Sequence, residues 1–330
     1  MAPGEERVYG ALDLGTNNCR LLLATPAADG FRVVEAFSRI TRLGEGLASS
    51  GKLSEPAIRR TLGALHHCAQ RLSRSGTERV RAVATEACRR AANCTQFLRR
   101  VKDETGLAME IISAEEEAHL ALAGCAPLLD GRHPHALVFD IGGGSTELIR
   151  VRMAGNDILV EAVASLPLGV VTLAEDRFTD IHHPDGYADT VAAARRLLRH
   201  FDGDGFLANL AAAGDLQLLG TSGTVTTLAG IHLNLPRYDR AQVDGMIMEF
   251  PAIAAVSRRL LAATADERAA SPCVGAERAD LVVAGCAILE AICDLWPAGR
   301  LRVADRGVRE GLLLSMMRAD RVGDTTGERA

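Results

Sequence analysis

The chain of 330 residues is long enough to form two domains, each with its own hydrophobic core. Its 48% hydrophobic residues, scarce aromatic residues and net charge of −5 are typical of a globular protein with aliphatic cores, and they argue against nucleic acid as the main partner. The most apolar stretch, Leu281 to Leu289, is shorter than the ~20 residues that cross a bilayer, so we expect no contact with a membrane. The absence of a signal-peptide pattern and of CxxC spacing among the eight cysteines predicts a cytoplasmic protein with reduced thiols.

The first half of the chain predicts three strands, then helix, strand, helix, strand and helix. Hydrophobic alternation broken by glycines marks the strands, and apolar residues at helical spacing mark the first helix. Ser54 is a suitable N-cap for that helix and Pro56 fits its first turn. The expected elements are three antiparallel strands within 8–40, a helix over 55–76, a strand over 80–84, a helix after 93, a strand over 108–112 and a helix over 114–123.

The second half repeats this order after a polar connection at 130–135. The expected elements are strands at 136–140, 146–152 and 158–165, a helix at 187–200, a strand at 216–220 leading into a helix, helices at 251–263 and 277–295, a strand at 301–303 and a helix from 307.

Three strands followed by alternating helices and strands is the ribonuclease H-like order. The sequence therefore predicts an α/β protein of two ribonuclease H-like domains with its site in an interdomain cleft. We expect the first domain over 1–125 and the second over 126–306. The last helix, about 307–330, is expected to pack back on the first domain.

One short phrase occurs in both halves. Asp13 ends an apolar run and is followed by a small polar turn and a second apolar run, and Asp140 does the same. Such a turn can present several N–H groups to a phosphate while its aspartate holds a hydrated divalent cation. An aspartate before glycine is also a common turn former, but two copies, each between strands, favour metal and phosphate binding.

Three loops are candidates for holding phosphate. Glycines in the second copy can form a nest of N–H groups, and the first copy offers a matching polar cradle. A third loop joins a strand to a helix, where an ordinary N-cap is an equal alternative to anion binding. The candidate residues are Gly142, Gly143, Gly144 and Ser145 in the second copy, Gly15, Thr16 and Asn17 in the first, and Ser222, Gly223 and Thr224 in the third loop.

Two charged residues of the first half are candidates for chemistry. Ser113 and Glu116 form a predicted capping box, so Glu117 is not needed for capping. Its carboxylate is a candidate general base for activating water, with a solvated helix face as the alternative. Arg89 follows a strand and could clamp a polyanion, although a single arginine there is usually a surface residue.

Taken together, these motifs identify a resemblance to the exopolyphosphatase/guanosine pentaphosphate phosphohydrolase (Ppx/GppA) family, within the superfamily of actin, Hsp70 and sugar kinases. The chain is similar to the short form, without the C-terminal region of longer members that is similar to HD phosphohydrolases. The matching blocks are 11–17, 84–89, 110–118, 138–148, 220–224 and 307–311.

The resemblance implies a role for each matching residue. Glu117 matches the glutamate that activates the attacking water, and Arg89 matches an arginine of the polyphosphate path. Asp140 matches the metal-binding aspartate, with Glu147 as the nearby acid. The reaction implied is hydrolysis of a terminal phosphoanhydride assisted by Mg²⁺ or Mn²⁺.

Several alternatives stay open at this point. The first is release of phosphate from inorganic polyphosphate, and the second is hydrolysis of guanosine pentaphosphate by the same chemistry. An ATP-dependent small-molecule kinase and a non-catalytic nucleotide sensor are alternatives of other classes. The resemblance implies no nucleic-acid partner and leaves room for a homodimer.

Overall fold

The computed structural model describes residues 7–28, 30–155, 157–175 and 179–327. The chain forms two compact units, one of Met1–Gly124 with Val308–Ala330 and the other of Cys125–Gly307. The first unit contains a five-stranded sheet and the second a six-stranded sheet, each with its own helices.

The first sheet begins with a meander of β1 (Tyr9–Leu14), β2 (Asn18–Ala27) and β3 (Gly30–Ile40). β4 (Arg79–Ala84) and β5 (Glu110–Ile111) add parallel strands on the other side of β1. The strand order β3-β2-β1-β4-β5 confirms the predicted ribonuclease H-like arrangement.

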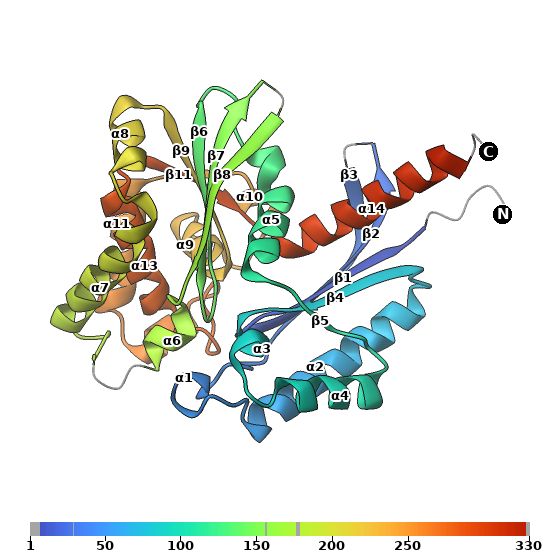
Figure 1. Cartoon of the computed structure of the whole chain (residues 1–330). Coiled ribbons are helices and arrows are strands. Elements are labelled where there is room, and N and C mark those ends of the chain that lie inside the picture. Colours follow the sequence, from blue (N-terminus) through green and yellow to red (C-terminus); the bar gives the residue numbers. More distant parts are fainter. Residues whose placement is uncertain (1–6, 29, 156, 176–178, 328–330) are drawn as a thin grey trace. The chain divides into compact units, whose positions relative to one another are not determined.

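Helices cover both faces of this sheet (Figure 1). One face packs against α2 and α4, and the other packs against α5 and α14. The last helix, α14, therefore lies on the first sheet. The helices of this unit are α1 (Leu47–Ser50), α2 (Glu55–Arg74), α3 (Glu86–Arg90), α4 (Cys94–Thr105), α5 (Ala114–Cys125) and α14 (Val308–Gly327).

The second sheet repeats the meander and the parallel strands, with strand order β10-β11-β9-β6-β7-β8. β10 lies antiparallel to β11 at one edge and was not predicted from the sequence. The strands are β6 (His135–Ile141), β7 (Thr146–Ala154), β8 (Asp157–Leu166), β9 (Leu216–Thr221), β10 (Ile247–Glu249) and β11 (Arg300–Ala304).

The core of the second unit is mostly aliphatic, with Phe139, Tyr187 and Trp296 as its buried aromatic residues. Trp296 is fully buried and donates a 2.9 Å hydrogen bond from Nε1 to Asp202. The helices of this unit are α6 (Val170–Ala174), α7 (Pro184–Asp202), α8 (Phe206–Ala213), α9 (Gly223–His232), α10 (Arg240–Val243), α11 (Phe250–Ala262), α12 (Ala265–Ala270) and α13 (Val282–Leu295).

Some element boundaries differ from the sequence prediction. The helix expected over 277–295 begins at Val282, because Gly275 adopts a left-handed conformation (φ 73°) and turns precede the helix. The strand expected over 108–112 is limited to Glu110–Ile111. The last helix is described to Gly327, and the rest of its expected range lies outside the described residues.

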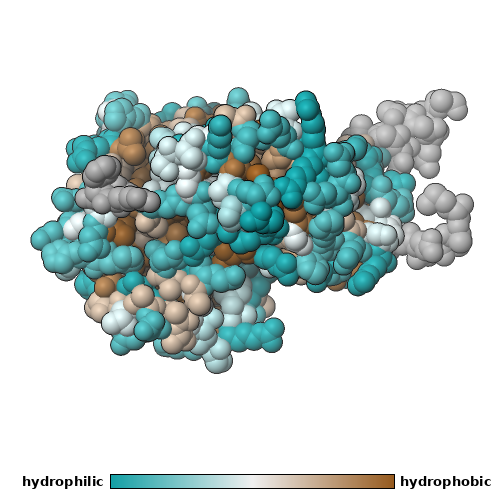
Figure 2. All heavy atoms as spheres, turned by 90° about the horizontal axis from the view of Figure 1, so that it is seen from below, coloured by the Kyte–Doolittle hydropathy of each residue, from teal (hydrophilic) through white to brown (hydrophobic). Residues whose placement is uncertain are grey.

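Hydrophilic residues cover most of the face shown in Figure 2, and strongly hydrophobic atoms appear there only in small separate patches. This distribution agrees with the burial of the aliphatic residues in the cores of the two units. In the described part of the chain, no helix is both long and apolar enough to cross a membrane.

Candidate active site

The two copies of the aspartate phrase fold into the same loop. In the first copy, the Gly15 N–H donates a 2.9 Å hydrogen bond to the Asn18 carbonyl. In the second copy, the Gly142 N–H donates a hydrogen bond of the same length to the Ser145 carbonyl. The repeated sequence motif therefore has the same backbone hydrogen bond in each unit.

A second doubled phrase holds these loops in place. Leu43-Gly44 follows β3 and Leu168-Gly169 follows β8. The Gly44 N–H donates a 2.9 Å hydrogen bond to the carbonyl of Thr16 in the first loop. The Leu-Gly repeat is therefore a local sequence signal for the position of each loop.

In the second unit the start of α6 binds the loop carbonyls. Val170 N–H donates to Gly142 at 3.0 Å and Val171 N–H donates to Gly143 at 2.8 Å. Because the carbonyls of the loop bond to α6, its amide N–H groups can point away from α6. No backbone hydrogen bond to the Gly143 or Gly144 amide comes from the described residues, so both suit an anion.

Gly169 makes this arrangement sterically possible. A Cβ atom at this position would lie 2.3 Å from the Gly143 carbonyl oxygen and 2.4 Å from the Gly144 carbonyl carbon. Both are backbone atoms, so any larger residue must displace the loop. Only glycine allows α6 to approach the loop this closely.

The second loop is flanked by two carboxylates. Asp140 on β6 and Glu147 on β7 are register partners, so their side chains share one face of the sheet. Glu147 is 2% exposed, and its Oε1 accepts hydrogen bonds of 2.7 Å from Ser145 and 2.8 Å from Ser165. These hydroxyl groups keep the buried carboxylate in one orientation.

The chemistry of this pair fits a hard divalent cation. Mg²⁺ and Mn²⁺ prefer carboxylate and water oxygens, usually from one or two protein carboxylates. Asp140 is the more exposed of the two, and it is the register partner of Thr221 on β9. Among the described residues, no cluster of three or more His, Cys, Asp or Glu residues surrounds a possible metal position.

The first loop has a different partner opposite its aspartate. Asp13 on β1 is the register partner of Arg20 on β2. Burial raises the pKa of Asp13, while Arg20 and Arg309 act in the opposite direction and Glu310 adds to the rise. A carboxylate next to arginines suits a structural or anion-orienting role better than a cation site.

Side chains of the first loop are turned inward. Thr16 and Asn17 are 7% and 8% exposed, so both are largely buried. Among the described residues, the buried side-chain oxygen of Asn17 has no hydrogen-bond partner. An unpaired buried amide oxygen is costly, so a bound group or water is expected to satisfy it.

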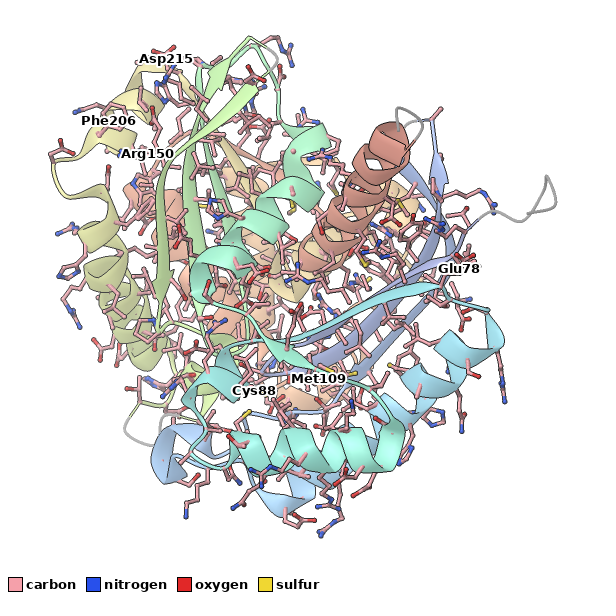
Figure 3. All side chains as sticks on the ribbon, turned by 45° about the vertical axis from the view of Figure 1, so that its right-hand side comes forward. Glu78, Cys88, Met109, Arg150, Phe206 and Asp215 are labelled. Carbon is pink, nitrogen blue, oxygen red and sulfur yellow. The ribbon has the colours of Figure 1, made fainter. Side chains whose placement is uncertain are left out.

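A compact ion-pair network in the first unit contains the two charged candidates. Arg89 on α3 donates a 2.7 Å hydrogen bond from Nη1 to the Glu117 carboxylate, and the same nitrogen donates to the Ile112 carbonyl at 3.0 Å. Its other nitrogens donate to Glu86 at 3.0 and 3.1 Å. The side chains of Glu86, Arg89 and Glu117 are only 14–17% exposed, so the network is a defined site. Figure 3 labels Cys88, the neighbour of Arg89 on α3.

Glu86 is a residue of this site that the sequence motifs do not predict. Its spacing of three residues from Arg89 on one helix was the available signal. Burial lowers the pKa of Arg89, but Glu117 and Glu86 outweigh that effect and raise it overall. The guanidinium therefore stays charged, and Glu86 holds it in place beside Glu117.

The three glutamates that open α5 differ in their surroundings. Ser113 Oγ accepts a 3.0 Å hydrogen bond from the Glu116 N–H, which is half of the predicted capping box. The Glu116 carboxylate instead pairs with Arg81 on β4, a contact with no local sequence signal. Glu117 lies one turn before Leu120 and Ala121, which are buried against the first sheet, so Glu117 belongs to the inner side of the helix.

The third loop carries an unusual backbone conformation. Ser222 has φ 103° and ψ 174°, a region that glycine occupies but that costs other residues of order 1–3 kcal/mol. Its hydroxyl accepts a 3.3 Å hydrogen bond from Thr224 N–H, so Ser222 also caps α9. The Thr224 side chain packs against Gly285 of α13 and is largely buried, so it does not lie on the surface of the loop.

Each unit thus gathers part of the predicted set. The second unit brings together Asp140, Glu147, the 142–145 loop and the end of β9 that leads into Ser222 and Gly223. The first unit contains the Asp13 loop with Gly15, Thr16 and Asn17, and the pair of Arg89 and Glu117.

The structure defines the class of this protein. It is an α/β protein with two ribonuclease H-like halves and one aspartate loop in each half. The model of the Ppx/GppA phosphatase family matches residues 23–320. Exopolyphosphatase 2 of Mycobacterium tuberculosis is 31% identical over 323 residues, which cover 93% of this chain and 97% of the relative.

Solved structures agree with this assignment. A Ppx/GppA family member from Aquifex aeolicus superposes with a TM-score of 0.76 at 29% identity, covering 96% of this chain and 99% of that one. An exopolyphosphatase from Cytophaga hutchinsonii superposes with a TM-score of 0.84 at 25% identity, covering 95% and 98%. The chain belongs to the Ppx/GppA phosphatase family, and it is an enzyme of the phosphoanhydride hydrolase class.

Proposed function

We propose that this enzyme is an exopolyphosphatase that releases the terminal phosphate of inorganic polyphosphate. The names of its relatives from Mycobacterium tuberculosis and Cytophaga hutchinsonii support this substrate. Family membership favours water over a small-molecule hydroxyl as the acceptor, which argues against a kinase or a non-catalytic sensor. We place the reaction in the cytoplasm.

The observation that carries the mechanism is the 2.7 Å contact between Arg89 Nη1 and the Glu117 carboxylate. In this proposal Glu117 accepts the proton of the attacking water as general base. Arg89, held by Glu86, keeps the carboxylate in one orientation and adds positive charge where the phosphate chain arrives. A positioned base and a fixed cation are what hydrolysis of a phosphoanhydride requires from the protein.

The loops supply hydrogen-bond donors to the phosphates. Amides of the 142–145 loop and of the Asp13 loop would hold phosphoryl oxygens, and Gly223 would add an amide at the start of α9. Asp140 and Glu147, which are register partners on adjacent strands, would hold Mg²⁺ or Mn²⁺. When bound, the cation offsets negative charge on the transferred phosphoryl group.

Guanosine pentaphosphate is the second candidate substrate, because the matching family model joins both activities in its name. Hydrolysis of either compound uses the same groups. The difference lies in what binds beyond the terminal phosphates.

The deciding experiment measures phosphate release from polyphosphate and from guanosine pentaphosphate, with Mg²⁺, at equal concentration of terminal phosphate. We expect a larger kcat/KM for polyphosphate. Release from guanosine pentaphosphate alone would favour the second candidate. Transfer of phosphate from ATP to an added sugar or carboxylic acid, without release into water, would contradict both.

A further inference from the structure

A polar pocket lies in the second unit, away from the aspartate loop. It has a volume of about 260 Å³ and lies where β9 and β11 begin. Thr221 lies at the opposite end of β9, next to its register partner Asp140 on β6. Thr221 lies five positions after Leu216, which corresponds to roughly 16 Å along the strand at ~3.3 Å per residue. In Figure 3, Asp215 marks the end of the sheet where this pocket lies.

The pocket is lined by basic side chains from two segments. Arg300 and Arg302 are two residues apart on β11, so they lie on the same face of the strand. Arg132 and His133 come from the connection before β6. Asp130 is the only acidic residue among the described residues that line the pocket, and it pairs with Arg132.

The hydrogen bonds of His133 connect its ring to both segments of the pocket wall. Its Nδ1 lies 3.2 Å from the Gly214 carbonyl, which can only accept, so Nδ1 carries the proton. Its Nε2 then accepts a hydrogen bond from Arg300 Nη2 at 3.3 Å. His133 thus holds the Arg300 guanidinium at the pocket.

The connection itself is rigidly held. The Gln217 amide makes two hydrogen bonds to the backbone of Asp130, of 2.8 Å to its N–H and 2.7 Å to its carbonyl. The pocket wall is therefore built before any ligand arrives. Ile247, which is 42% exposed, adds an apolar surface beside the arginines.

We propose that this pocket binds a phosphate dianion, either inorganic phosphate or the phosphate of a small ester, as an effector site separate from the active site. Because Asp130 neutralises the charge of Arg132, the two positive charges that remain in the pocket are those of Arg300 and Arg302. A phosphate monoester carries about −1.5 to −2 charges at pH 7, and guanidinium groups bind it through paired hydrogen bonds. Ile247 offers a contact for the organic part of an ester. The proposal goes beyond the exopolyphosphatase activity and does not depend on it.

The chain contains a local reporter for this pocket. Trp296 is the single tryptophan, and its carbonyl accepts a 2.8 Å hydrogen bond from the N–H of Ala298, which lines the pocket. The test titrates the wild-type protein with inorganic phosphate and with guanosine monophosphate, and follows Trp296 fluorescence. We expect a saturable change that is preserved in Arg258→Gln, a control at an exposed position of α11.

The double variant Arg300→Gln/Arg302→Gln should bind at least about tenfold more weakly, because charge-assisted hydrogen bonds are lost. Tighter binding of guanosine monophosphate than of phosphate would identify an ester as the ligand, and equal binding would identify inorganic phosphate. Unchanged titration of the double variant, or no saturable change in the wild type at millimolar ligand, would overturn the proposal. If the double variant does not fold, Arg300→Gln alone decides by the same criterion. None of these readouts uses turnover, so their failure leaves the proposed function untouched.

Discussion

Asp140 and Glu147 are register partners on adjacent antiparallel strands, whereas the equivalent positions of the first unit are Asp13 and Arg20. The spacing between partners is the same in both units, and so is the hydrogen bond that closes each loop. One copy therefore pairs two carboxylates and the other pairs a carboxylate with a guanidinium. This single change of partner supports the proposal that the second copy binds the cation and that the first copy binds anions.

The first prediction concerns the cation. Asp140→Asn should raise the Mg²⁺ concentration for half-maximal turnover by at least about tenfold, because the variant replaces a charged oxygen donor with a neutral one. The measurement is phosphate release over a Mg²⁺ titration. Asp157→Asn, at an exposed position where β8 begins, is the matched control and should keep the wild-type metal response. A wild-type response in Asp140→Asn would remove this residue from the metal site.

The second prediction tests the general base. Glu117→Gln should lower kcat by about 10²–10⁴-fold, because proton transfer from water is lost while the side-chain shape is kept. Polyphosphate binding, measured by equilibrium dialysis, should persist. Glu116→Gln is the control, since its carboxylate pairs with Arg81 rather than with Arg89. Equal kcat values for the two variants would refute the assignment of Glu117.

The sequence was informative wherever the signal is local. Hydrophobic alternation and helical spacing were enough for the paired sheets, and the doubled aspartate phrase was enough to locate two loops. Tertiary contacts have no such signal. The ion pair of Glu116 with Arg81 joins residues 35 positions apart, and it replaces the local contact that the capping pattern predicts. The role of Gly169 likewise depends on how closely α6 approaches the loop.

The third prediction is a pH dependence of stability. Burial raises the pKa of Asp13 above its ordinary value of 3.8, so the folded state binds the proton more tightly than the unfolded state. Protonation of Asp13 therefore adds to the free energy of unfolding. This contribution is fully present below pH 3.8 and is lost as pH rises through the pKa of Asp13 in the folded state. Relative to Asp13→Asn, the wild type should lose free energy of unfolding as pH increases. Urea unfolding of both proteins at several pH values measures this difference, and a constant difference would contradict the burial argument.

The fourth prediction uses the strained residue before α9. Ser222→Gly should raise the free energy of unfolding by about 1 kcal/mol, because relief of the unfavourable φ of 103° exceeds the entropic cost of glycine and the small cost of losing the cap. Ser222→Ala keeps the strain and loses the cap to Thr224, so it should be less stable than the wild type. The order of thermal midpoints should be glycine, wild type, alanine. Both variants lack the capping hydroxyl, so equal stability of alanine and glycine would show that the backbone at this position is not strained.

The fifth prediction tests how the second loop is held. Gly169→Ala places a methyl group where the Gly143 carbonyl oxygen now lies 2.3 Å away, so the loop or α6 must move. We expect a loss of about 1–3 kcal/mol in stability and a higher KM, since the loop amides no longer point at the phosphate together. Gly131→Ala, which meets no atom within 4 Å, is the control in the same unit and should change neither quantity. Steady-state kinetics and urea unfolding check both effects. An unchanged KM with reduced stability would mean that Gly169 supports packing alone and that the loop amides do not bind the substrate.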